Sequence, residues 1–266
     1  MSQFDRLPSE RARRALERMT VSIVIPVYNE RATVEELLRR VASVPIAREV
    51  IVVDDGSSDG TRPLLRQLHE RGLIDHLVFH AGNRGKGAAL RTGFRHATGD
   101  VVAVQDADLE YDPGEIPRLL GPIADGRADA VYGSRVLGRP HRVLFFRQMV
   151  GNRLLTLLSN ILTGLSLTDM ETCQKLVRRE LLQSLPLTVD RFGIEPEITA
   201  RLAQARARIC EMPVSYDGRS YAEGKKIGWK DGVSAIWFIL RCNLLGPKAR
   251  PWEAPRPAWL EEDAEE

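Results

Sequence analysis

Short apolar runs alternate with longer, half-polar segments over residues 21–134. The runs lie at 21–27, 49–55, 77–80, 101–104 and 130–134, and the first holds five β-branched residues in seven. Runs of this length and composition predict buried strands of a parallel sheet. The segments between them have helical periodicity, with Leu37, Leu38 and Val41 as the apolar stripe of the first. The alternation predicts an α/β fold with a mostly parallel central sheet, right-handed crossovers and flanking helices.

The pattern changes after residue 138. Residues 139–153 mix Phe145, Phe146 and Met149 with several arginines, and residues 154–167 continue as an apolar segment. This combination fits either a helix packed on the sheet or an amphipathic helix in a membrane interface. Further helices are predicted near 179–184, from about Pro196 and after residue 226, and a strand is predicted at 209–216.

These changes divide the chain into a polar, basic arm at 1–19, one domain at 20–245 and a tail at 246–266. The domain has a strand-rich first half at 20–138 and a helical second half at 139–245. The tail is rich in Pro and acidic residues, so we expect it to lie loose.

Composition excludes several classes of protein. With 266 residues, 43% of them hydrophobic, the chain can bury a large core and is not disordered. Its net charge of +2 gives no support for nucleic-acid binding. Three scattered cysteines make neither a disulfide framework nor a zinc pattern and suit a reducing cytoplasm. We see no signal peptide and no stretch of about 18–20 apolar residues, so we expect a cytoplasmic protein, at most peripheral on the inner face of the plasma membrane.

An acidic stretch directly follows the apolar run at 101–104. Asp106, Asp108 and Glu110 stand at every second position there. Three carboxylates held so close repel one another and need a cation or protons. Their hard oxygen atoms suit Mg²⁺ or Mn²⁺, which usually keeps some water and is completed by substrate phosphates. A solvated acidic turn is the alternative, but ligands of open α/β sheets bind beyond the carboxyl ends of the strands, where this stretch lies.

Other polar residues follow the remaining predicted strands. Tyr28 and Glu30 come after the first, Asp55 after the second and Arg135 after the fifth. The third leads into a glycine-rich loop at 82–87, which carries Arg84 and Lys86 and opens a helix. Glycines let backbone amides approach an anion, and a helix N-terminus favours negative charge. We therefore expect one rim of the sheet to hold a nucleotide and its phosphates.

Taken together, these residues resemble the family 2 glycosyltransferases, which have the Rossmann-like GT-A fold. The matching motifs are VSIVIPVYNE at 21–30, VVDDGSSDGT at 52–61, NRGKGAALRTG at 83–93, QDADLEYDP at 105–113 and VYGSR at 131–135. No single motif is specific, but their combination and order are. Within the family the chain is most similar to the polyprenol-phosphate sugar synthases, which make dolichyl- or undecaprenyl-phosphate mannose or glucose.

The resemblance implies roles for individual residues. It implies that Asp106, Asp108 and Glu110 hold the metal on the sugar-nucleotide diphosphate. The acceptor phosphate would face Arg135 and Arg147 in the acceptor-side second half, and Arg219 would close over the diphosphate. The residues implied for the nucleotide-sugar pocket are Pro26, Tyr28, Glu30, Asp55, Lys86 and Asp106.

Two departures from that group leave the acceptor open. Its membrane-anchored members carry C-terminal spans that this chain lacks, and residues 166–176 follow the group's pattern only loosely. The implied reaction is an inverting, metal-dependent transfer of a hexose from a UDP- or GDP-sugar, with a polyprenyl phosphate as the first choice of acceptor. Such a phosphate needs no base, whereas a hydroxyl acceptor does, and Asp169 or Glu171 is then the candidate base.

Two other functions use similar residues. A nucleotidyltransferase also combines an α/β sheet with paired carboxylates, but its usual Gly-rich signature is replaced here by PVYNE after the first strand. A non-catalytic sugar-nucleotide sensor would not need to keep three carboxylates. The sequence therefore favours an enzyme, a hexosyltransferase, with catalytic roles for Asp108, Arg135, Asp169, Glu171 and Arg219.

Overall fold

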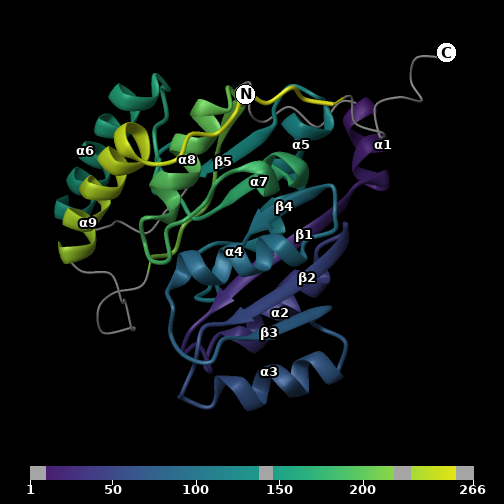
Figure 1. Ribbon diagram of the computed structural model, residues 1–266. Coiled ribbons are helices and arrows are strands. Elements are labelled where there is room, and N and C mark those ends of the chain that lie inside the picture. The colour runs from purple at the N-terminus through teal and green to yellow at the C-terminus, as the bar shows by residue number, and fades with distance from the viewer. Residues whose placement is uncertain (1–9, 138–145, 219–228, 256–266) are drawn as a thin grey trace.

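A computed structural model of the chain describes residues 10–137, 146–218 and 229–255 (Figure 1). Seven strands form one sheet in the order β3-β2-β1-β4-β6-β5-β7. Their bounds are β1 Thr20–Val27, β2 Ala47–Asp54, β3 His76–Phe79, β4 Val101–Val104, β5 Ala130–Ser134, β6 Lys175–Arg178 and β7 Ile209–Pro213. Six of the strands run parallel, and β6 is antiparallel to both of its neighbours. The predicted α/β fold of GT-A type is confirmed.

Helices cover both faces of the sheet. They are α1 Glu10–Arg18, α2 Val34–Ser43, α3 Thr61–Glu70, α4 Lys86–His96, α5 Ile116–Ala124, α6 Phe146–Thr163, α7 Arg179–Ser184, α8 Ile194–Gln204 and α9 Trp229–Leu240, and short helical turns lie at Pro113–Glu115 and Arg241–Leu245. Successive strand residues point to opposite faces. Ile23 and Ile25 of β1 pack with the apolar sides of α1, α2, α3 and α5, whereas Val24 packs with those of α4, α7 and α8.

Strand β6 is the main element that the sequence pattern did not predict. It has only two apolar residues, Leu176 and Val177, between Lys175 and Arg178. All four residues are buried, and β6 lies between β4 and β5 with Val102 opposite Val177 and Val131 opposite Leu176. A strand from the second half therefore separates β4 from β5 in the sheet.

Both ends of the described chain are more closely packed than we expected. Helix α1 lies against α5, with Ala15 and Met19 buried, so this part of the arm belongs to the domain. Residues 246–255 have no regular secondary structure, but contacts with the domain hold part of this segment. Trp252 donates its backbone N–H to Ala205 O at 2.7 Å and lies under the guanidinium of Arg178, while Ala249 packs on the same core as α8.

Helix α4 packs tightly on the sheet, and a glycine-to-alanine substitution tests this packing when it is made at Gly93 and, for comparison, at Gly121. A Cβ atom at Gly93 would overlap Cγ1 of Val24, whereas at Gly121 in α5 nothing lies within 4 Å. We expect Gly93→Ala to lower the free energy of unfolding by about 1–3 kcal/mol through overpacking. We expect Gly121→Ala to raise it by about 0.5–1 kcal/mol, because alanine restricts the unfolded chain. Urea unfolding measures both, and equal shifts of one sign would contradict this packing.

Candidate functional site

The loops that follow β1 and β2 are joined by hydrogen bonds at the carboxyl edge of the sheet. Asn29 donates its backbone N–H to Ser57 Oγ at 2.9 Å and accepts from Ser58 N–H at 2.8 Å, and Glu30 N–H donates to Thr61 Oγ1 at 3.1 Å. Asn29 has a φ of 52°, a left-handed conformation that asparagine tolerates better than most residues. This turn leaves Tyr28 half exposed beside the second loop. The structure thus brings together three of the residues predicted for the nucleotide pocket: Tyr28, Glu30 and Pro26 at the end of β1.

Asp55 anchors the glycine-rich loop. Its buried carboxylate accepts hydrogen bonds from His80 Nδ1 at 2.7 Å, Arg84 N–H at 3.0 Å and Gly85 N–H at 2.7 Å. A carboxylate offers about four acceptor positions, so these donors use most of its capacity. The geometry assigns Asp55 a structural task that the sequence did not suggest, namely holding the 82–87 loop against the end of β2.

Two glycines of this loop bring it against the second half of the chain. Gly85 has a φ of 101°, which disfavours any side chain. Cβ atoms at Gly85 and Gly87 would collide with the backbone oxygens of Asp190 and Val189. Ala88 N–H also donates to Asp190 O at 2.9 Å. The loop is therefore held between β2 and the segment that leads into α8.

Lys86, the first residue of α4, reaches from this loop to the acidic stretch. Its Nζ lies 2.9 and 3.0 Å from the two carboxylate oxygens of Asp106. Burial would lower the pKa of Lys86, but attraction to Asp106, Cys173 and Glu195 raises it well above its usual value. Burial would likewise raise the pKa of Asp106, yet Lys86 holds it below its usual value. Both groups are therefore charged at neutral pH, and a cation and a predicted metal ligand meet at one point.

The three carboxylates of the acidic stretch do not converge. Leu109 has a φ of 64°, which turns the chain between Asp108 and Glu110. Glu110 N–H donates to Asp108 Oδ1 at 3.2 Å, while the Glu110 carboxylate accepts from the Tyr216 hydroxyl at 2.5 Å. Among the described residues, no three His, Cys, Asp or Glu side chains are grouped so that they could hold a metal ion. In this structure Tyr216 therefore holds Glu110, and the role of Glu110 as a third metal ligand stays a prediction.

Asp106 and Asp108 still fit a divalent cation. Both present hard carboxylate oxygens at the carboxyl edge, next to the loop that we expect to hold phosphates. Mg²⁺ is commonly bound through only one or two carboxylates, with water and substrate phosphates completing its ligands. The donor chemistry thus fits a site in which the nucleotide supplies the remaining ligands.

Arg135 and Asp169 form a buried ion pair across the site. Arg135 donates from Nε and Nη2 to the two oxygens of Asp169, each at 2.7 Å, and its backbone N–H adds a third bond at 3.1 Å. Asn152 of α6 donates to the same carboxylate at 2.9 Å. Burial would raise the pKa of Asp169, but Arg135 holds it below its usual value. A carboxylate bound this way is a poor proton acceptor, so the geometry disfavours Asp169 as a general base.

Glu171, in contrast to Asp169, is suited to accept a proton. One of its carboxylate oxygens is buried and has no hydrogen-bond partner among the described residues. Burial, together with repulsion from Glu195, raises the pKa of Glu171 from 4.5 to about 7. A carboxyl group with a pKa near neutrality suits general acid–base chemistry.

Two predicted residues cannot be placed. Arg147 lies in α6, but its side chain is outside the described part of the chain, and Arg219 falls in the segment 219–228, which is also outside it. Their predicted contacts with phosphates remain predictions.

The site also contains residues that the sequence analysis missed. Glu195 and Cys173 both contact Lys86, and Tyr216 connects Glu110 to the Arg135 guanidinium, which lies 5.2 Å from its ring centroid. Glu195 stands in the first turn of α8, where an acidic residue is favoured for helix stability alone. Its sequence context therefore gave no sign of a partner in α4.

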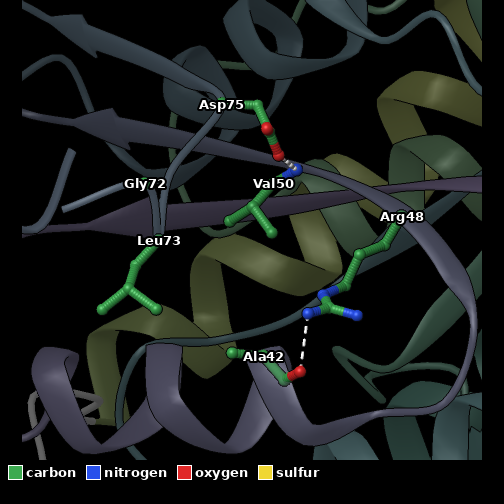
Figure 2. Close-up of a pocket in the computed structure, with 6 residues that line it drawn as sticks. All are labelled: Ala42, Arg48, Val50, Gly72, Leu73 and Asp75. Atoms are coloured by element: carbon green, nitrogen blue, oxygen red, sulfur yellow. Dashed lines mark hydrogen bonds between the residues drawn. The ribbon is translucent and has the colours of Figure 1, made fainter. Parts of the chain in front are cut away.

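A cavity of about 280 Å³ lies away from this site, at the amino-terminal end of β2 (Figure 2). Its polar groups already serve the fold: Arg48 Nη2 donates to Ala42 O at 2.6 Å and Val50 N–H donates to Asp75 at 2.7 Å. Since ligands of open α/β sheets bind at the other edge, we assign no function to this cavity.

Comparisons with known proteins give a family for the sequence. The sequence profile of Glycosyl transferase family 2 matches residues 22–185. The undecaprenyl-phosphate 4-deoxy-4-formamido-L-arabinose transferase of Edwardsiella ictaluri is 34% identical over 232 residues, 85% of this chain and 69% of that protein. The Pseudomonas paraeruginosa transferase of the same name is 32% identical, over 77% of this chain and 60% of its own length.

Solved structures share the fold at lower identity. Glucosyl-3-phosphoglycerate synthase from Mycobacterium tuberculosis, in complex with Mg²⁺ and UDP, has a TM-score of 0.67 at 22% identity and covers 91% of this chain and 86% of its own. The same enzyme with Mn²⁺, UDP and glucosyl-3-phosphoglycerate has a TM-score of 0.66 at 22% identity, with 86% and 81% covered.

The raised pKa of Glu171 predicts a pH-dependent cost to stability. Below pH 4.5 the group is protonated in both states, so it costs nothing. As the pH rises to about 7, the unfolded chain releases the proton first, and the folded state loses stability. We expect the advantage of Glu171→Gln over wild type to grow by roughly 2–3 kcal/mol between pH 4.5 and pH 8, as measured by urea unfolding.

Glu70→Gln provides the control, because Glu70 is exposed at the end of α3. Its stability should follow that of wild type across the same pH range. A constant difference between Glu171→Gln and wild type at every pH would contradict the burial of a protonated carboxyl group.

Proposed function

Since the chain belongs to glycosyl transferase family 2, we propose that this glycosyltransferase moves a hexose from a UDP- or GDP-sugar to a polyprenyl phosphate, with inversion at the anomeric carbon. The proposal rests mainly on the ion pair between Lys86 and Asp106. That contact joins the glycine loop, suited to phosphates, to the acidic stretch, suited to a metal ion. A sugar-nucleotide diphosphate needs both.

The donor side of the site is formed by the loops after β1, β2 and β3. We place the nucleotide against Pro26, Tyr28 and Glu30, with Asp55 beneath, and the diphosphate beside Lys86. Solved structures of the same fold contain UDP with Mn²⁺ or Mg²⁺, which supports a UDP-sugar as the first donor to test. The printed name of the relatives concerns an arabinose derivative, so a donor panel should include such a sugar with the hexoses.

A divalent ion, Mg²⁺ or Mn²⁺, would be held by Asp106 and Asp108 and would offset the charge that develops on the leaving diphosphate. The chain's own contribution is a set of charges that are already in place before the reaction. Lys86 is fixed by its carboxylate partners, and Arg135 is fixed by Asp169. Such preorganised cations stabilise a developing anion without having to reorganise during the reaction.

The acceptor phosphate is assigned to Arg135. Nε and Nη2 of its guanidinium donate to Asp169, which fixes the orientation of the group. A guanidinium held rigidly in this way can orient a phosphate for attack at the anomeric carbon. An acceptor phosphate is already anionic, so no general base is needed. Relatives named for transfer to undecaprenyl phosphate support this choice.

A hydroxyl acceptor remains the second candidate, because Glu171 has the properties of a base. Its pKa of about 7 and its unpartnered buried oxygen suit it to take a proton at neutral pH. Glu171→Gln separates the two cases. It should abolish transfer to a hydroxyl and leave transfer to a lipid phosphate largely intact.

The second half of the chain offers a surface for a membrane. Helices α6 and α9 pack together at one side of the molecule (Figure 1) and expose apolar side chains, among them Leu157, Ile161 and Trp237. No Asp or Glu occurs between residues 130 and 168 or between 232 and 252. Apolar and basic residues without acidic ones suit the interface of an anionic bilayer. No helix in the described ranges meets the length and hydropathy needed to cross one.

We place this contact on the cytoplasmic face of the membrane. Cys173, Cys210 and Cys242 are free thiols, which suit a reducing compartment. Through Asn152, α6 also reaches the Asp169–Arg135 pair, so a bilayer at its outer face would lie close to the proposed acceptor site.

Substitution of a proposed metal ligand tests the reaction. We expect Asp108→Ala to lower nucleotide release from a UDP- or GDP-sugar with undecaprenyl phosphate and Mn²⁺ by at least about 100-fold. Asp112→Asn is the control, because the Asp112 side chain accepts from Gly114 N–H at the start of a helical turn, and Asn can do the same. Activity of Asp108→Ala near the wild-type rate would refute the metal assignment, and turnover with hydroxyl acceptors alone would refute the lipid-phosphate acceptor.

Vesicle sedimentation tests the membrane surface. We expect the protein to bind vesicles rich in phosphatidylglycerol more tightly than phosphatidylcholine vesicles, and Ile161→Glu to weaken that binding about tenfold. Gln67→Glu is the matched control, since it adds the same charge to an exposed position of α3, beside β3 at the other end of the sheet (Figure 1). Equal vesicle binding by both variants would contradict the assignment. So would self-association of the protein through this face without vesicle binding.

A further inference from the structure

One ammonium group serves two carboxylates at the centre of the site. Lys86 Nζ lies 2.9 Å from Asp106 Oδ1 and 3.0 Å from Glu195 Oε1, and Cys173 Sγ is a third neighbour at 3.0 Å. We call these four residues the Lys86 cluster. The side chains of Lys86, Asp106 and Glu195 are only 12%, 17% and 7% exposed, so water screens their charges weakly.

Four separate segments supply the cluster. Lys86 begins α4, Asp106 follows β4, Cys173 precedes β6 and Glu195 lies in the first turn of α8. Lys175 of β6 also attracts the carboxylates of Asp106 and Glu195. Its ammonium group, however, donates to the backbone oxygens of Met170 and Thr172. Lys86 is therefore the cation of the cluster that contacts a proposed metal ligand directly.

The contact between Lys86 and Asp106 conflicts with metal binding. Lys86 donates to both oxygens of Asp106, at 2.9 and 3.0 Å, which are the atoms that a divalent ion would need. A metal ion at Asp106 would also repel the ammonium group. A buried ammonium group needs partners that offset its charge, so Lys86 would need an acceptor other than Asp106 if Asp106 held a metal ion.

We propose that Glu195 is a positioning residue that retains Lys86 in the site when Asp106 binds the metal ion. The inference rests on the proposed function. Glu195 draws the ammonium group away from Asp106, which lowers the competition between Lys86 and the metal. It also keeps Nζ beside the position of the diphosphate. The site thus changes from a lysine shared by two carboxylates to a lysine on Glu195 and a metal on Asp106.

Mn²⁺ affinity at saturating UDP, measured by the loss of the free Mn²⁺ electron paramagnetic resonance signal, tests the proposal without turnover. We expect Glu195→Gln to weaken Mn²⁺ binding about tenfold, because Lys86 then has Asp106 as its sole carboxylate partner in the cluster. Loss of one negative charge near the metal would also weaken binding, so the variant alone does not decide.

A double-mutant cycle with Lys86→Gln separates the two causes. If Glu195 acts through Lys86, the Glu195→Gln substitution should change Mn²⁺ affinity less than about twofold in the Lys86→Gln background. The double variant removes one charge of each sign, so we expect it to fold better than either single variant. Circular dichroism checks the folding of all three.

Three results can be told apart. The cycle supports the proposal if the effect of Glu195→Gln disappears together with Lys86. An equal effect in both backgrounds, or no effect in either, overturns it. Absence of Mn²⁺ binding by the wild-type protein with UDP instead refutes the metal site of the proposed function, and with it the inference.

Discussion

The site depends on the requirement that a charge removed from water must be paired. Two groups of charged residues meet this requirement at the carboxyl edge of the sheet: Lys86 with Asp106 and Glu195, and Arg135 with Asp169. In each, one partner follows a strand of the first half and another comes from the second half. Removing one partner of a buried pair typically costs about 3–5 kcal/mol, because the other charge is then left buried and unpaired. The same charges are the ones that a diphosphate and an acceptor phosphate would use.

Much of the architecture was predictable because a parallel sheet gathers its strand ends at one edge. Apolar runs marked β1 to β5, and because these strands run parallel, the residues that follow them lie at the same edge of the sheet. Strand β6 was missed because its sequence, KLVR, has charged residues at both ends. Those residues are buried through partners elsewhere, such as Asp129, 3.6 Å from Arg178. Local periodicity carries no information about such partners.

The pairings within the site were less predictable than its location. Sequence reasoning identified Asp55, Glu110 and Asp169 as acidic residues near a ligand, but could not say which groups they bind. The structure gives Asp55 to the glycine loop, Glu110 to Tyr216 and Asp169 to Arg135. Each partner is distant in the sequence, and each pairing changes the chemistry available to the carboxylate. One oxygen of Glu171, by contrast, has no hydrogen-bond partner in the part of the chain that the structure describes, and burial raises the pKa of this group.

The position of β6 also has a consequence for how the chain folds. Strand β4 has no neighbour on one side until β6 arrives from the second half, and β5 joins the sheet only through β6 and β7. During synthesis, the first half emerges with an exposed edge strand, which is prone to pair with other chains. Long-range pairing of this kind also slows folding. The two halves of the chain therefore complete one sheet together, and we expect them to fold as one cooperative unit.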